Sequence, residues 1–188
     1  SRCPAEGPES TAHLGIRPLA FDLDGYYAEL ASYADRFDVS EAGRIPAATG
    51  DGDARTEYPI LLLRTRNSTA TKRMLIVAGV HGNEVAGLLA VPRILDLLAQ
   101  QQPAHANWQV SIATPVNPVG VANGSRYNAL GCDINRDFQD SQTLEARLVQ
   151  DLVASDAPDH LRGSVIAVWS GSMRIGQTIG PVGVTLAL

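Results

Sequence analysis

The chain has 188 residues, of which 45% are hydrophobic and 19% charged, with a formal net charge of −5. This length suits one globular domain and can bury a core without added staples. The acidic balance argues against a nucleic-acid-binding protein, which would show a basic face. No apolar run reaches the roughly 18 residues that a membrane-spanning helix needs.

The first 17 residues are rich in Pro, Gly, Ser and Glu, and we expect them to be poorly ordered. No apolar signal segment is present, so the compartment stays open between cytoplasmic and exported. The two cysteines, Cys3 and Cys132, do not make a disulfide framework. We expect both to be free thiols, with a single bridge between them as the alternative.

A helix is predicted over residues 24–36, because four apolar residues recur at i, i+4, i+7 and i+11 and share one helical face. These residues are Tyr26, Leu30, Tyr33 and Phe37. The stretch 48–56 is typical of a turn or loop. Strands are predicted over 58–64 and 73–80. The second, RMLIVAGV, is almost wholly apolar, which is typical of a central strand covered on both faces of an α/β sheet.

A helix is predicted over residues 84–101, and Pro92 inside it is expected to bend it. A further strand is predicted over 108–114. The long segment 117–138 is dense in Asn, Gly, Arg and Asp. Long loops of this kind inside compact domains are usually either functional or disordered.

The last predicted elements are a helix over 143–153 and a strand over 164–170. The tail 158–188 is rich in Gly, Val, Ile and Thr and has almost no acidic residues. We therefore divide the chain into a start (1–17), the N-terminal part of an α/β domain (18–157) and an atypical tail. We interpret the tail as truncated or altered in its reading frame.

The first candidate site directly follows the apolar strand. His81 and Glu84 stand three residues apart where strand passes into helix, so an imidazole and a carboxylate can converge on one metal ion. A hydrolytic zinc ion needs three protein ligands and one open position for water. Gly82 allows a tight turn there. A short His-x-x-Glu pattern also arises by chance, and Glu84 then only favours the positive end of a helix.

The second candidate site is a cluster of Arg126, Asn135 and Arg136 in the long segment. Arginine can donate two parallel hydrogen bonds to a carboxylate, and Asn135 adds a neutral donor. A second arginine can polarise a carbonyl and stabilise the oxyanion formed when water attacks it. The alternative is a loop held by ion pairs of these arginines with Asp133 and Asp137.

Three motifs occur in a fixed order: His-Gly-Asn-Glu, then Asn-Pro-x-Gly, then Arg-x-Asn-Ala-x-Gly-x-Asp-Ile-Asn-Arg-Asp-Phe. Together they resemble the zinc carboxypeptidase family, most closely its short bacterial members. The resemblance covers about residues 21–154 and is sharpest over 74–90 and 113–138. It implies an α/β fold with a mixed central sheet flanked by helices, and a site at the carboxyl edge of the sheet.

The resemblance also implies roles for the candidate residues. His81 and Glu84 would bind zinc, the implied cofactor. Arg126 would polarise the scissile carbonyl, and Asn135 with Arg136 would bind the terminal carboxylate of a peptide. In the family, zinc polarises a water molecule while a separate glutamate moves its proton.

The sequence departs from the family pattern after the last of the three motifs. The family's third ligand is a histidine that follows an apolar strand. The four histidines here are His13, His81, His105 and His160, and apart from His81 none stands in a ligand position. No Glu follows Glu145 and no Tyr follows Tyr127, so the family's catalytic glutamate and capping tyrosine have no counterpart. Family membership and the activity of this chain are therefore separate questions.

Three functions are consistent with these residues. The first is a zinc metallocarboxypeptidase-type hydrolase that cleaves a C-terminal or cell-wall-type peptide bond with metal-activated water. The second is a zinc deacylase of N-acyl amino acids, although the stretch 128–133 favours the peptidase. The third is an inactive, truncated relative that only binds peptide carboxylates. The partner is then a peptide or N-acyl amino acid, with no nucleic acid and no membrane span, and the oligomeric state stays open.

Overall fold

A mixed five-stranded sheet with the order β1-β2-β4-β3-β5 forms the centre of the molecule. The computed structural model describes residues 21–47, 56–100, 107–156 and 167–170. The strands are β1 (Phe37–Pro46), β2 (Glu57–Thr65), β3 (Lys72–Ala78), β4 (Trp108–Thr114) and β5 (Ala167–Ser170). β2 pairs antiparallel with β1 and β4, whereas β3 pairs parallel with β4 and β5. The apolar strand is therefore internal to the sheet, as predicted.

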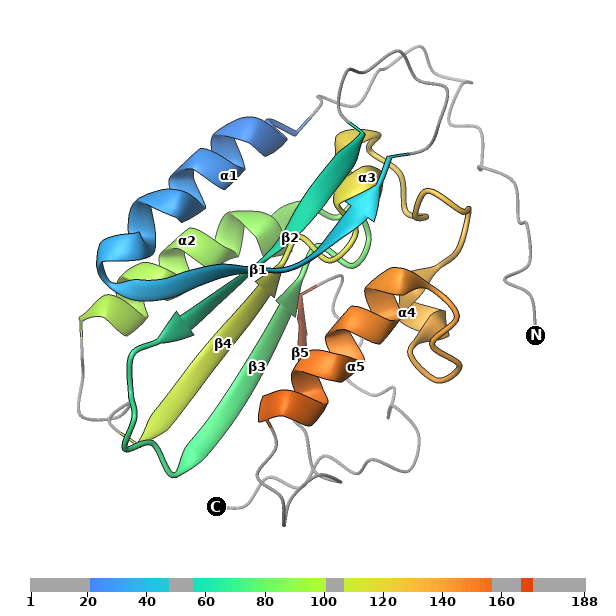
Figure 1. Cartoon of the computed structure of the whole chain (residues 1–188). Coiled ribbons are helices and arrows are strands. Elements are labelled where there is room, and N and C mark those ends of the chain that lie inside the picture. The colour runs from blue at the N-terminus through green and yellow to red at the C-terminus, as the bar shows by residue number, and fades with distance from the viewer. Residues whose placement is uncertain (1–20, 48–55, 101–106, 157–166, 171–188) are drawn as a thin grey trace.

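Helices cover both faces of this sheet (Figure 1). They are α1 (Leu23–Ala31), the 3-10 helix η2 (Ser32–Asp35), α2 (Ala86–Ala99), α3 (Pro118–Ala122), α4 (Ile134–Asp137) and α5 (Leu144–Asp156). The predicted α/β class with a mixed, helix-flanked sheet is confirmed. Within the described residues, no helix combines the length and apolar character needed to cross a membrane.

Two hydrophobic clusters lie on opposite faces of the sheet, because successive side chains of a strand point to opposite sides. On β2, Leu63 belongs to the same cluster as Leu30 of α1 and Leu88 of α2. Its neighbour Leu62 belongs to the other cluster, with Val149 of α5. The site thus rests on a sheet that is packed from both sides.

Most predicted elements agree with the structure within three residues at each end. The exception in type is β1, which the sequence did not predict. Only Phe37 and Ile45 are buried along it, and a register shift between Glu41 and Gly43 interrupts its pairing with β2, so it lacks the alternation of a regular strand. Phe37, assigned to the first helical face, instead begins β1. α2 is one helix through Pro92.

Some predictions fall outside the described residues. These are the state of residues 1–17, the predicted loop 48–56 apart from Thr56, and the tail apart from β5. β5 agrees with the end of the strand predicted over 164–170. The expectation that Cys132 is a free thiol is wrong, because this buried cysteine is disulfide-bonded. Cys3 itself is not among the described residues.

Candidate active site

The candidate site lies where the parallel strands β3 and β4 end, the edge at which α/β sheets place ligands. Two backbone hydrogen bonds tie these ends together: Val116 N–H donates to the carbonyl of Ala78 (3.0 Å), and Asn117 N–H donates to that of Gly79 (2.8 Å). Gly79 has a φ of +72°, which only glycine adopts freely. The chain can therefore leave β3 sharply, with a cis Thr114–Pro115 bond after β4 beside it.

Asn117 supports this edge. It is fully buried, and its side-chain oxygen accepts from Gly120 N–H (2.9 Å), which caps the short helix α3. Its side-chain amide donates to the carbonyl of Arg126 (3.4 Å). A Cβ atom built on Gly82 would overlap the backbone of Gly120, so this turn can approach α3 only with glycine at position 82.

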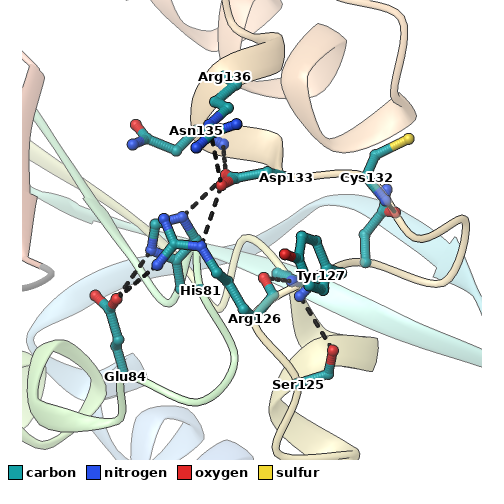
Figure 2. Close-up of polar contacts among 11 residues, drawn as sticks. His81, Glu84, Ser125, Arg126, Tyr127, Cys132, Asp133, Asn135 and Arg136 are labelled. Carbon is teal, nitrogen blue, oxygen red and sulfur yellow. Dashed lines mark hydrogen bonds and ion pairs between the residues drawn. The ribbon is translucent and has the colours of Figure 1, made fainter. Parts of the chain in front are cut away.

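His81 stands between two carboxylates. Its Nε2 lies 3.0 Å from Asp133 Oδ1, and its Nδ1 lies 3.2 Å from Glu84 Oε1 (Figure 2). A neutral imidazole carries one N–H, so it can donate to only one of them. The ring nitrogen without a hydrogen then faces a carboxylate oxygen with no proton between them, unless a second proton or a cation lies there.

Of the two carboxylates, Glu84 is the one that can still accept a hydrogen bond or bind a cation. Its Oε1 also accepts from Arg126 Nη1 (3.2 Å), while its Oε2 is buried and has no hydrogen-bond partner in the described part of the chain. An unpaired buried carboxylate oxygen is costly unless a proton or a cation binds it. The donor set therefore fits a metal ion bound between the Nδ1 atom of His81 and Glu84.

The described residues do not complete a metal site. No group of three His, Cys, Asp or Glu side chains within them is arranged to hold one ion. His13, His105 and His160 lie outside the described residues. The third ligand thus stays an open prediction, and the two expected ligands lie within reach of a shared ion.

Asp133 is the residue that sequence analysis missed as part of the site. It accepts from His81, from Arg126 Nε (3.1 Å at Oδ2) and from the backbone N–H of Asn135 (3.0 Å at Oδ1), where it caps α4. Burial alone would raise the pKa of Asp133, but the hydrogen bonds and positive charges of His81 and Arg126 outweigh it and lower the pKa to about 2. The carboxylate therefore stays charged and fixes the orientation of the imidazole.

Asn135 and Arg136 lie on α4 beside Asp133 (Figure 2). The Arg136 side chain is 76% exposed, and its Nε lies 3.7 Å from Asp133 Oδ2, so its guanidinium keeps donors for a ligand. Asp137 does not pair with either arginine as the alternative interpretation expected. It accepts instead from the backbone of Gln142 and from the backbone and hydroxyl of Thr143, before α5.

The five predicted site residues therefore come from three segments that fold to one place. His81, Glu84 and Arg126 lie together, and Asp133 links them to the two residues of α4. The ion pair of Arg126 with Asp133, offered from sequence as an alternative to substrate binding, is present. It leaves the side chain 37% exposed, so the two interpretations are compatible in this geometry.

Proteins of known name share this fold. The metallo-carboxypeptidase of Burkholderia cenocepacia superposes with a TM-score of 0.58 at 21% identity, over 72% of this chain and 38% of that chain. The fungal "Probable carboxypeptidase 2" of Trichophyton verrucosum (strain HKI 0517) is 29% identical over 135 residues. These cover 66% of this chain and 25% of the relative. In its fold and in its ordered motifs, the chain is similar to zinc carboxypeptidase-like proteins.

Within this class, residues 70–160 match the model of the succinylglutamate desuccinylase/aspartoacylase catalytic domain. The succinylglutamate desuccinylase of Yersinia pestis (strain Pestoides F) is 31% identical over 116 residues, or 54% of this chain and 34% of the relative. The chain thus spans between a quarter and about a third of the curated relatives named here. Peptidases and deacylases both occur among its relatives.

Proposed function

We propose that the site serves zinc-dependent hydrolysis of an amide bond in a substrate that carries a free carboxylate. The observation that carries this proposal is the buried Glu84 Oε2, which has no hydrogen-bond partner among the described residues. The other oxygen of this carboxylate, Oε1, lies 3.2 Å from the Nδ1 atom of His81. A carboxylate that can accept a cation then stands next to Arg126 of the loop and near Arg136 of α4. Amide hydrolysis at a carboxylate-bearing substrate uses both kinds of charge.

The residues divide the work as follows. His81 and Glu84 would hold zinc, which supplies a Lewis acid and lowers the pKa of a bound water. Asp133 accepts a hydrogen bond from Nε2–H of His81, which leaves the lone pair of Nδ1 available for a metal ion. Arg126 lies against Glu84 and can donate to the carbonyl oxygen of the scissile bond as it gains negative charge. The exposed guanidinium of Arg136, with the amide of Asn135, binds the substrate carboxylate.

Two substrate classes follow from the relatives. Carboxypeptidase-type cleavage is supported by the fungal relative. Deacylation of an N-acyl amino acid is supported by the matched catalytic-domain model and by the desuccinylase. Both reactions attack an amide carbonyl near a carboxylate, so the described residues serve either.

The test measures zinc bound per chain after dialysis, in the parent and in the double variant His81→Ala/Glu84→Ala. We expect about one zinc in the parent and none in the variant. The control is Asp151→Ala, which removes an exposed carboxylate on α5 and should keep the zinc. Zinc in neither protein would contradict the proposal and leave a carboxylate-binding relative without metal chemistry.

The substrate class is tested separately with zinc-loaded protein. A blocked dipeptide with a free carboxyl terminus and N-acetyl-L-aspartate are compared by the release of free amine, with and without a chelator. Chelator-sensitive release from the dipeptide supports the peptidase, and from the N-acetyl compound the deacylase. Release that is equal with and without the chelator would contradict metal-dependent hydrolysis.

A further inference from the structure

A buried polar pair lies behind the loop that carries Arg126 and Asp133. The side-chain amide of Asn128 donates to both carboxylate oxygens of Glu145, each at 3.2 Å. Asn128 is 7% exposed and Glu145 2% exposed. Glu145 lies in the first turn of α5, so this pair joins the loop to a helix packed on the sheet.

Asn128 also organises the loop itself. Its side-chain oxygen accepts from the backbone N–H groups of Leu130 (3.0 Å) and Cys132 (2.9 Å). Its own N–H donates to the carbonyl of Cys132 (3.0 Å), and its carbonyl accepts from Gly131 (3.0 Å). Gly131 completes the turn with a φ of +74°. One side chain thus uses its oxygen to close the turn and its amide to anchor it.

We propose that Glu145 is a positioning residue for the candidate site, holding Arg126 and Asp133 against His81 and Glu84 by fixing Asn128. Arg126 stands two residues before Asn128, and Asp133 directly follows Cys132, so the closed turn sets where both charged groups point. The effect of this positioning on ligand binding rests on the function proposed above.

A purely structural role is the alternative, since a carboxylate in a first helical turn also favours the helix dipole. That role needs no burial. A buried carboxylate is expensive unless its acceptors are occupied, and an apolar side chain would fill this position at lower cost. Burial raises the pKa of Glu145, against smaller opposing effects of its own backbone N–H and of Asn128. Its burial therefore costs free energy, and both hydrogen bonds that it accepts from Asn128 tie it to the loop.

The test exchanges the two partners. Asn128→Asp alone sets two carboxylates against each other, while its oxygen can still close the turn. Glu145→Gln alone keeps an acceptor for Asn128. The double variant Asn128→Asp/Glu145→Gln restores a hydrogen bond in the reverse direction, because the new amide donates to the new carboxylate. Asp151→Asn, which alters an exposed carboxylate on α5, is the matched control.

Two readouts are taken on the full zinc-loaded chain. The first is hydrogen exchange at the backbone amides of Leu130 and Cys132. The second is the Kd for N-acetyl-L-aspartate, with the binding amplitude recorded separately. Asn128→Asp should speed exchange and raise the Kd about tenfold at unchanged amplitude. The double variant should return both values to within about twofold of the parent.

A loss of amplitude at unchanged Kd would overturn the positioning role, because it would show that the variant only removes chains from the binding-competent pool and leaves the site of the remaining chains intact. A double variant no better than Asn128→Asp would overturn it as well. If the parent does not bind the probe, the substrate proposal fails, and exchange at the two amides still decides the role of Glu145. Should Asn128→Asp not fold, Glu145→Met removes the acceptor without adding charge. Faster exchange at the same amides supports the proposal, and unchanged exchange overturns it.

Discussion

Arg66 and Arg126 each join segments far apart in the sequence, but their guanidinium groups meet different partners. Arg66 donates to the carboxylate of Asp38 (2.9 Å) and to the carbonyls of Asp35 (2.6 Å), Ala34 (2.8 Å) and Phe37 (3.1 Å). These acceptors surround the end of η2 and the start of β1. The charge of Arg66 is therefore balanced by one carboxylate, and its other hydrogen bonds go to backbone carbonyls.

The guanidinium of Arg126 instead meets two carboxylates, those of Asp133 and Glu84. One of them, Glu84, keeps a buried oxygen without a partner among the described residues. Arg66 therefore completes a local structure, whereas a carboxylate that Arg126 contacts keeps an oxygen that accepts no hydrogen bond among the described residues. The difference indicates that an arginine marks a functional site when its acceptors are themselves incompletely satisfied.

Among substitutions that test this difference between the two arginines, the largest expected effect is on the free energy of unfolding. Arg66→Met should lower the free energy of unfolding by about 1–2 kcal/mol, since it removes several partly exposed hydrogen bonds at a helix end. Zinc bound per chain should not change. Urea unfolding with zinc analysis measures both. Arg44→Met, which removes an exposed pair with Glu41, is the control and should cost less.

The next effect concerns metal affinity. Arg126→Met should strengthen zinc binding about tenfold, because the guanidinium competes with the metal for Glu84 and repels a cation nearby. Competition with a chelating dye measures the affinity. Arg136→Met is the control, since Arg136 pairs with Asp133. Zinc binding that weakens in Arg126→Met would show that the arginine supports the metal site instead.

The smallest expected effect concerns Glu145 and pH. Burial raises its pKa above the ordinary 4.5, with Asp137 raising it further and Arg147 opposing. The folded state thus favours the protonated form, so this contribution to stability is complete below about pH 4.5 and is lost as pH rises through the raised pKa. Glu145→Gln should remove that loss of stability, because an amide does not titrate. Urea unfolding between pH 4 and 7 measures it, and parallel curves for parent and variant would contradict it.

The sequence predicted the fold where local patterns and packing agree. β3 was recognised from its apolar run and α5 from its spacing, because both bury a regular set of side chains. β1 was missed because its burial is irregular and its pairing with β2 shifts in register. The short helices α3 and α4 were missed because each is defined by its capping residue, Asn117 or Asp133, and not by periodicity.

The sequence predicted the charged residues of the site. It did not predict the residues that hold them in place. His81, Glu84 and Arg126 stand in motifs whose spacing points to chemistry. Asp133 was treated only as a possible partner of an arginine, although an Asp two residues before an Asn-Arg pair is also a helix cap. The link of Asn128 to Glu145 spans 17 residues and depends on how α5 packs, so no local pattern contains it.

The contact of Gly82 with Gly120 has a consequence for how such sequences can diverge. A side chain at position 82 would overlap the backbone at position 120, and one at position 120 would overlap the side chain of Asn117. The first two motifs therefore tolerate change only as a set, although a whole helix and strand separate them along the chain. Substitutions at positions 82, 117 and 120 should therefore be selected against together. Substitutions on the exposed face of α2, which lies between these positions in the chain, should be tolerated.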